Sequence, residues 1–403
     1  MVNVSSSNGL EKRPKLRFPG FDEPYKQCRI GNIYAERSQR GASGMELLSV
    51  TMNDGVIPRS EIEGKDNSSE DKSNYKIVRK GDMVYNSMRM WQGANGISPC
   101  DGIVSPAYTV LMPKQEISNG YFAALFKSTS LINEFRKNSQ GMTSDTWNLK
   151  YPQIKTIKVL IPSVSEQEKV SELFNVLDAR IAAQAQLIEA LKKYKRGLIS
   201  EILRQKLTIA QKDEKWVDIS LNDVAEGFEY GMNAAATAYD KIHKYIRITD
   251  IDDDFHTYID VDPVSPSGVL EDKYRVGVND ILFARTGASV GKSYLYQESD
   301  GDLYFAGFLI RIHVKDGVDS GYVFLNTLTE EYDKWVLLES ARSGQPGINA
   351  EQYRRYRFKL PSLKTQKHIS KIAQNIDERI QKENQRLHLL RALKDGMLQQ
   401  LFI

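Results

Sequence analysis

The sequence contains only two cysteines, Cys28 and Cys100, among its 403 residues. Two thiols cannot form a disulfide framework, and such a low content suits a protein of the reducing cytoplasm. No run approaches the roughly 18 consecutive apolar residues of a membrane-spanning helix. The N-terminus also lacks the apolar stretch of a secretory signal. We therefore expect a cytoplasmic protein without a membrane segment.

The sequence also lacks a marked excess of one charge, since 55 basic and 52 acidic side chains leave a net charge of +3. This balance is too mild to predict nucleic-acid binding by itself. The acidic cluster at residues 250–254 indicates that any DNA-binding surface would have to be local.

Familiar catalytic and metal-binding patterns are missing as well. Residues 287–293, GASVGKS, place three residues between Gly287 and Gly291 where a phosphate-binding loop needs four. No Asn/Asp/Ser-Pro-Pro-aromatic motif of an amino-methyltransferase occurs, and none of the five histidines has metal-ligand spacing with a cysteine. We therefore predict no catalytic residue, no metal site and no cofactor bound by this chain.

What the sequence does contain is a long amphipathic segment that occurs twice. Residues 161–204 and 360–402 align without a gap at an offset of 199 residues, which pairs Gln167 with Gln366. In both copies apolar residues recur in two rows spaced seven apart, the pattern of a coiled-coil seam. The predicted seam consists of Val170, Phe174, Leu177, Ile181, Ile188, Leu191, Leu198, Ile202, Ile369, Ile376, Ile380, Leu387, Leu390, Met397 and Leu401.

Polar residues interrupt the seam at matching positions, Gln184 and Lys195 in the first copy and Glu383 and Lys394 in the second. A helix of roughly 40 residues is ~60 Å long, too long to bury its seam against one compact domain. We therefore expect the two long helices to pack against each other. A duplicated chain favours a pseudo-two-fold axis and hence an antiparallel pair, in which Lys195 would lie near Glu383 and Gln184 near Lys394.

The segments that precede the two helices have strand composition and turn-rich flanks, and they follow a common plan in both halves. We predict an α+β fold with two mixed α/β domains in tandem, each followed by a long helix of an antiparallel intramolecular coiled coil. The predicted parts are a flexible N-terminal segment 1–20, domains 21–161 and 207–360, and helices 162–206 and 361–403.

Loops in both halves carry side chains suited to DNA. Arg89 and Gln92 follow one predicted strand, and Arg285 and Thr286 follow its counterpart. Arginine pairs bidentately with guanine and glutamine with adenine in the major groove, while glycine lets the backbone approach phosphate. Polar loops also precede each long helix. The candidate DNA-binding residues are Arg89, Gln92, Thr143, Ser144, Arg247, Arg285, Thr286, Arg342 and Gln345.

Less specific interpretations compete with these assignments. An arginine after a strand is more often solvated or salt-bridged than in contact with a base, and Trp91 and Trp147 suit packing better than base stacking. One alternative function is a non-catalytic coiled-coil scaffold with two protein-binding heads. Another is a self-sufficient methyltransferase, which would have to bind S-adenosylmethionine without a partner.

The layout resembles the DNA-specificity subunits of type I restriction–modification systems. The most specific matches are the two helix starts, IPSVSEQEKV with LDARI and LPSLKTQKHI with IDERI. The YIRITDI strand, the ARTGASVGK segment, the SGQPGIN loop and the N-terminal LRFPGF also match, so the resemblance covers nearly the whole chain.

This resemblance implies that the two globular domains are target-recognition domains, each reading half of a split site in double-stranded DNA. It implies that the helices set the half-site spacing and dock the modification (methyltransferase) subunits. Those partners would carry S-adenosylmethionine and methylate adenine, and a restriction/motor subunit using ATP and Mg would join for cleavage. The chain itself would be a non-catalytic specificity and assembly subunit.

Overall fold

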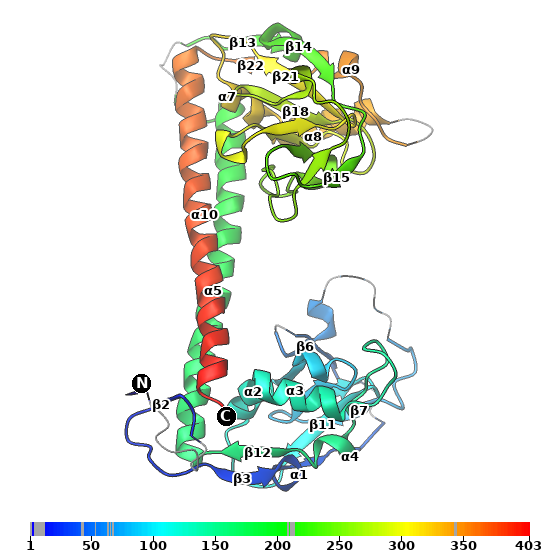
Figure 1. Cartoon of the computed structure of the whole chain (residues 1–403), viewed down its shortest axis with the longest axis vertical. Coiled ribbons are helices and arrows are strands. Elements are labelled where there is room, and N and C mark those ends of the chain that lie inside the picture. Colours follow the sequence, from blue (N-terminus) through cyan, green and yellow to red (C-terminus); the bar gives the residue numbers. More distant parts are fainter. Residues whose placement is uncertain are drawn as a thin grey trace. The chain divides into compact units, whose positions relative to one another are not determined.

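The computed structural model describes residues 2–3, 13–41, 44–52, 54–62, 64, 66, 68–207, 209, 214–341 and 345–403. The chain divides into two compact units: unit 1 is residues 1–185 with 385–403, and unit 2 is residues 186–384 (Figure 1). The division passes through the two long helices, α5 (Val164–Leu203) and α10 (Leu363–Gln400). Each unit therefore holds one globular domain and a segment of both helices.

The globular domain of unit 1 contains the antiparallel sheet β4-β11-β8-β9 and the sheet β6-β5-β10-β7, in which β5 and β10 are parallel. The antiparallel pair β3–β12 leads into α5. The strands are β3 Lys26–Arg29, β4 Tyr34–Glu36, β5 Leu47–Val50, β6 Val56–Pro58, β7 Lys76–Val78, β8 Met83–Asn86, β9 Asn95–Ile97, β10 Gly102–Val104, β11 Tyr108–Pro113 and β12 Lys158–Ile161. The helices are α1 Ile30–Ile33, α2 Asn119–Leu125, α3 Thr129–Asn138 and α4 Tyr151–Ile154, with 3₁₀ turns η1 Arg59–Glu61 and η2 Met90–Gln92.

The globular domain of unit 2 repeats this plan with the sheet β14-β21-β18-β19, the parallel pair β16–β20 and the antiparallel pairs β13–β22 and β15–β17. The strands are β13 Val217–Ser220, β14 Ala225–Tyr230, β15 Ala236–Ala238, β16 Lys244–Ile246, β17 Val264–Pro266, β18 Asp280–Ala284, β19 Ser293–Leu295, β20 Leu303–Phe305, β21 Leu309–Val314 and β22 Arg357–Leu360. The helices are α6 Leu221–Val224, α7 Ser320–Asn326, α8 Glu330–Ser340 and α9 Ala350–Arg354, with 3₁₀ turns η3 Ile248–Asp250, η4 Asp272–Tyr274 and η5 Glu298–Asp300.

Local sequence signals explain the matching helices of the two domains. Helix α3 begins after Ser128 and α8 after Thr329, and each hydroxyl accepts a hydrogen bond from the backbone amide three residues later. These N-caps satisfy donors that the first turn of a helix leaves unpaired. Interior strands β8 and β18 are mostly apolar and almost entirely buried, so they form the centre of each domain.

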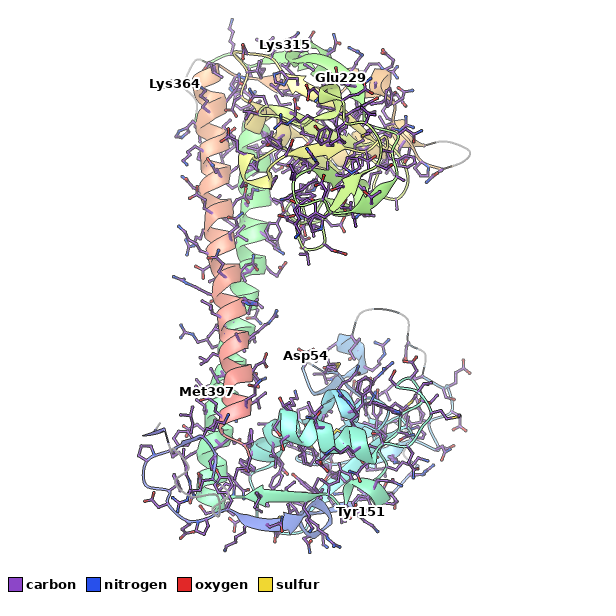
Figure 2. The ribbon with its side chains drawn as sticks, viewed as in Figure 1. Asp54, Tyr151, Glu229, Lys315, Lys364 and Met397 are labelled. Carbon is purple, nitrogen blue, oxygen red and sulfur yellow. The ribbon has the colours of Figure 1, made fainter. Side chains whose placement is uncertain are left out.

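The two long helices run antiparallel in both units, as the duplication predicts (Figure 1). In unit 1 the ring of Phe174 stacks on Phe402 at 5.9 Å between centroids, and Asp178 pairs with Lys394. The residue number on α5 thus rises from 174 to 178 while that of its partner falls from 402 to 394, as in an antiparallel pair. In unit 2 Lys195 pairs with Asp377 at 2.6 Å. Figure 2 labels Lys364 near the start of α10 and Met397 near its end.

The register predicted for this pair is wrong. Lys195 contacts Asp377, six positions before Glu383, and Lys394 contacts Asp178, six positions before Gln184. The prediction matched the polar interruptions to one another. Instead, each lysine in the seam pairs with a partly exposed aspartate of the other helix, Asp377 at 38% and Asp178 at 53% exposure.

All residues predicted to form the seam are buried or half-buried. The first turns of each helix pack into the core of their own domain, since Val170 and Phe174 share a cluster with Phe122 of α2. The end of the other helix joins the same core: Leu401 and Phe402 in unit 1, and correspondingly Ile199 and Ile202 of α5 in unit 2. Each globular domain is therefore anchored to both helices.

The N-terminal segment predicted to be flexible lies partly outside the described residues, which omit residues 1 and 4–12. Its described part pairs Val2–Asn3 with Leu16–Arg17. Arg17 is only 4% exposed, and its guanidinium forms two hydrogen bonds, of 2.9 and 2.8 Å, with the buried carboxylate of Glu166 on α5. This end of the segment is thus packed against α5 within unit 1.

Two further expectations concern the cysteines and membrane spans. Cys28 and Cys100 are both free thiols. Among the residues described, none of the helices combines the length and the apolar character that crossing a membrane requires.

Candidate nucleic-acid interface

In unit 1 two loops meet at the end of strand β8. The first, here called the post-strand loop, is residues 87–94, and the second, the pre-helix loop, is residues 139–149 before α4. The amide of Leu149 donates to the carbonyl of Ser87 at 2.9 Å, and the rings of Trp91 and Trp147 meet edge to face at 5.2 Å. The two loops therefore form one continuous surface.

The geometry of the pre-helix loop depends on hydrogen bonds within it. Gln140 and Asn148 exchange backbone hydrogen bonds of 3.0 and 2.8 Å, and Thr146 donates to the carbonyl of Thr143 at 3.0 Å. Gly141 has a φ of +141°, and a Cβ there would lie 2.5 Å from the carbonyl oxygen of Thr146. Glycine is required at this turn, which leaves Thr143 and Ser144 exposed at the tip.

The candidate donors of unit 1 differ in their exposure and in their partners within the domain. Arg89 is exposed, and its side chain forms no hydrogen bond or ion pair with other described residues. Gln92 is half-buried at the end of η2. Trp91 donates through Nε1 to the carbonyl of Met88 at 3.0 Å and packs on Trp147, so both tryptophans have a packing role.

Unit 2 joins the equivalent loops at the end of strand β18, residues 285–291 and 341–349. The amide of Ile348 donates to the carbonyl of Arg285 at 2.9 Å, which matches the bond between Leu149 and Ser87. Gly287, with a φ of +79°, donates to the carbonyl of Pro346 at 3.1 Å, and Thr286 bridges to Gly347. The structure thus brings together the two segments of each half that the sequence identified separately.

The side chains displayed by unit 2 are not those of unit 1. Arg285 occupies the position of Ser87, and its guanidinium lies 5.0 Å from the ring centre of Tyr230, with Nε buried and without a hydrogen-bond partner among the described residues. Gln345 is exposed beside Gly287, and Thr286 is half-buried. Arg342 lies outside the described residues.

Arg247 is bound within its own domain. Its guanidinium forms two hydrogen bonds of 2.8 Å with the carboxylate of Asp250, and these bonds raise the pKa of Arg247 above its ordinary value. The neighbouring acids are also paired: Asp253 with Lys292, and Asp254 with Lys192 of α5 at 3.0 Å. Arg247 therefore matches the salt-bridged interpretation, unlike Arg89 and Arg285.

Two aromatic side chains at this edge of unit 2 were not identified from the sequence. Tyr230 ends β14, and its hydroxyl accepts a hydrogen bond from the amide of Ala350 at 3.2 Å. Phe308 precedes β21, is largely exposed, and its carbonyl accepts the amide of Arg285 at 3.0 Å. No sequence motif marks either residue, because only the pairing of β21 with β14 and β18 places them here.

The family assignment follows from a model match that covers most of the chain. The model of the type I restriction modification DNA specificity domain matches residues 47–193 and again residues 213–392. This protein belongs to that family. The two matches correspond to the two halves of the duplication.

Known relatives agree with this assignment. A putative type I restriction enzyme MjaX specificity subunit of Methanocaldococcus jannaschii is 28% identical over 210 residues, or 49% of this chain and 48% of that protein. The chain spans about half the length of the curated relatives it matches.

Solved structures share the fold over nearly the whole chain. The type I restriction–modification S subunit from M. genitalium has a TM-score of 0.57 at 14% identity, covering 97% of this chain and 99% of that one. A chain from work on complex assembly and conformational transition of the type I R-M system has a TM-score of 0.59 at 14% identity, covering 95% and 98%. At this identity the similarity establishes the fold.

Proposed function

We propose that this protein binds a bipartite double-stranded DNA target and that each globular domain reads one half-site. The observation that carries this proposal is the repeated pair of joined loops, which has the same backbone connection but different side chains in the two units. A shared framework with different donors suits two readers of different sequences, because base identity is read by side-chain donors and acceptors.

Arg89 and Gln345 are the best placed candidates for base contacts. Both are exposed, and the guanidinium of Arg89 has no carboxylate partner among the described residues that would compete with DNA. A fully available guanidinium can pair bidentately with guanine, whereas the guanidinium of Arg247 would first have to leave Asp250. Arg285, Thr286, Gln92, Thr143 and Ser144 supply further donors on the same two surfaces.

In the cytoplasm, the chain would be the non-catalytic specificity and assembly subunit of a type I restriction–modification complex. Its partners would be modification subunits, which bind S-adenosylmethionine and methylate adenine, and a restriction/motor subunit that uses ATP and Mg. Family membership supports this role. A scaffold with two protein-binding heads is the alternative that the experiments below separate from it.

The long helices carry repeated exposed apolar residues that suit docking of two copies of one partner. Tyr194 on α5 is 58% exposed and Leu393 on α10 is 45% exposed, and these positions are equivalent in the duplication. Leu389 adds a further exposed apolar side chain one turn before Leu393. Apolar side chains left in water at symmetry-related positions are typical of interaction sites, here for the modification subunits.

The proposal is tested by DNA binding of the complex assembled with modification subunits. Binding through phosphates predicts an affinity that falls by ~10³–10⁵ between 50 and 200 mM salt if about 6–10 phosphates are contacted. Binding that is absent or independent of salt would favour the scaffold. S-adenosylmethionine binding by the isolated chain would instead favour the self-sufficient methyltransferase.

Base reading by Arg89 is tested separately with a matched arginine control. Arg89→Ala is expected to relax the base preference at one position of one half-site and to weaken specific binding by ~10–100-fold, the usual worth of a bidentate base contact. Arg79→Ala in the same domain removes an exposed arginine that is paired with Asp101, and it should leave the target unchanged. Sequencing of methylated sites measures both variants, and an unaltered target in Arg89→Ala removes Arg89 from the interface.

A further inference from the structure

A buried glutamine links the globular domain of unit 1 to the first turns of its long helix. Gln167 on α5 is 2% exposed. Its side-chain oxygen accepts a hydrogen bond of 3.1 Å from the amide of Ser118, the residue that precedes α2, and its side-chain nitrogen donates at 3.0 Å to the carbonyl of Pro162. One amide group thus ties helix α2 to the entrance of α5.

The same connection recurs in unit 2 at the equivalent residue. Gln366 on α10 is also 2% exposed and accepts from the amide of Asp319 at 2.9 Å, while it donates to the carbonyl of Pro361 at 2.8 Å. Asp319 precedes α7, the counterpart of α2. Here the hydroxyl of Ser370 also donates to the carboxylate of Asp319.

Close approach of the two helices supports the same junction. In unit 1 a Cβ on Gly120 of α2 would lie 2.0 Å from the hydroxyl oxygen of Ser171, one turn after Gln167. In unit 2 a Cβ on Gly321 would lie 3.0 Å from the hydroxyl oxygen of Ser370. Glycine and serine at these places let the short helix approach the long one closely. This contact between the helices and the hydrogen bonds of the glutamine amide together restrict where the short helix lies.

Glutamine is suited to this junction because its amide both accepts from an N–H and donates to a carbonyl. An ionised glutamate keeps the acceptor but loses the donor, and methionine, which has a similar shape, has no donor and only a weak acceptor. The loops of the candidate interface contribute none of these hydrogen bonds. The junction therefore affects where a domain sits on its helix without touching the residues that would read bases.

We propose that Gln167 and Gln366 are positioning residues that hold each recognition domain at one place on its own helix and thereby fix the spacing between the two half-sites. This inference rests on the proposed DNA-binding function. Loss of the junction lets the domain shift along or around the helix entrance, so the complex accepts spacers of neighbouring lengths while each half-site sequence stays the same.

The test is sequencing of methylated sites in cells that contain the modification subunits and either Gln167→Met or Gln366→Met. Sites whose spacer is one base pair longer or shorter should gain about tenfold in methylation relative to the original spacing, the factor equivalent to ~1.4 kcal/mol. Gln167→Glu retains the acceptor but turns a buried carboxylate toward the carbonyl of Pro162, so it should broaden the spacer preference at least as much. The matched control is Gln186→Met, which alters an exposed glutamine on α5 and should change nothing.

Gly120→Ala provides a second perturbation that leaves both glutamines intact. The added methyl group should push α2 away from Ser171 and broaden the spacer preference in the same way. An equal loss of methylation at all sites, with an unchanged spacer preference in every variant, would refute the positioning role. Such a result would show that the substitutions lower only the stability of the protein. A wild-type complex without any bipartite methylated site would instead contradict the proposed function itself.

Discussion

A lengthening of both long helices should lengthen the spacer of the target by a calculable amount. The sites for insertion are after Ala185 in α5 and after Asn384 in α10, which are equivalent in the duplication and lie where the two units divide. The insertions preserve the ion pair of Asp178 with Lys394, which lies within unit 1, and that of Lys195 with Asp377, which lies within unit 2. Four helix-forming residues at each site add about one turn.

The expected change follows from the two helical geometries. Four residues extend an α-helix by ~6 Å and rotate it ~40° beyond a full turn. A base pair advances DNA by about 3.4 Å, and one turn contains about 10–10.5 base pairs, or roughly 35° for each. The translation favours an increase of nearly two base pairs and the rotation favours one. We therefore expect a spacer longer by one or two base pairs, with both half-sites unchanged.

Sequencing of methylated sites is the assay for this insertion. The control carries the four residues in α5 alone, which displaces the pairing of one helix against the other and should abolish methylation. Half-sites that change while the spacer keeps its original length would refute the role of the helices as the determinant of spacing.

Three other predictions concern stability and domain function. Arg17→Met leaves the carboxylate of Glu166 buried without its partner and should destabilise unit 1 by ~3–5 kcal/mol. The double variant with Glu166→Met should be close to neutral. Calorimetry measures the stability of the two variants, and an equal loss of stability in both would contradict this account. Burial lowers the pKa of His256, so its neutral form is favoured in the folded state and unit 2 should lose stability as pH falls below about 6.5. His256→Asn keeps a donor for the carbonyl of Ser293 and suits the φ of +55°, so its thermal unfolding should depend less on pH over this range, and an unchanged dependence would exclude His256 as the source. Exchange of residues 21–155 for those of another family member should change one half-site only, and sequencing that finds both changed would contradict independent reading by the two domains.

The candidate interface was only partly accessible from the sequence. Arg89, Arg285 and the polar loops were recognisable because they follow strands at matching places in a repeat. That Arg247 is neutralised by Asp250, whereas Arg89 has no such partner among the described residues, depends on which side chains the folded backbone brings within hydrogen-bonding distance. Tyr230 and Phe308 could not be found, since strand pairing alone places them beside Arg285.

The sequence alone determined the duplication, the two long helices and their antiparallel pairing. These properties are periodic or repeated along the chain, so they appear in the order of residues without knowledge of distant contacts. The tertiary structure decided the register of the pair, in which Lys195 meets Asp377 and not Glu383, and the joining of two loops into one surface in each unit. It also gave Gln167 and Gln366 a physical role. Their repetition is visible in the sequence, but a side-chain amide acquires partners only when two segments distant in the chain fold against each other.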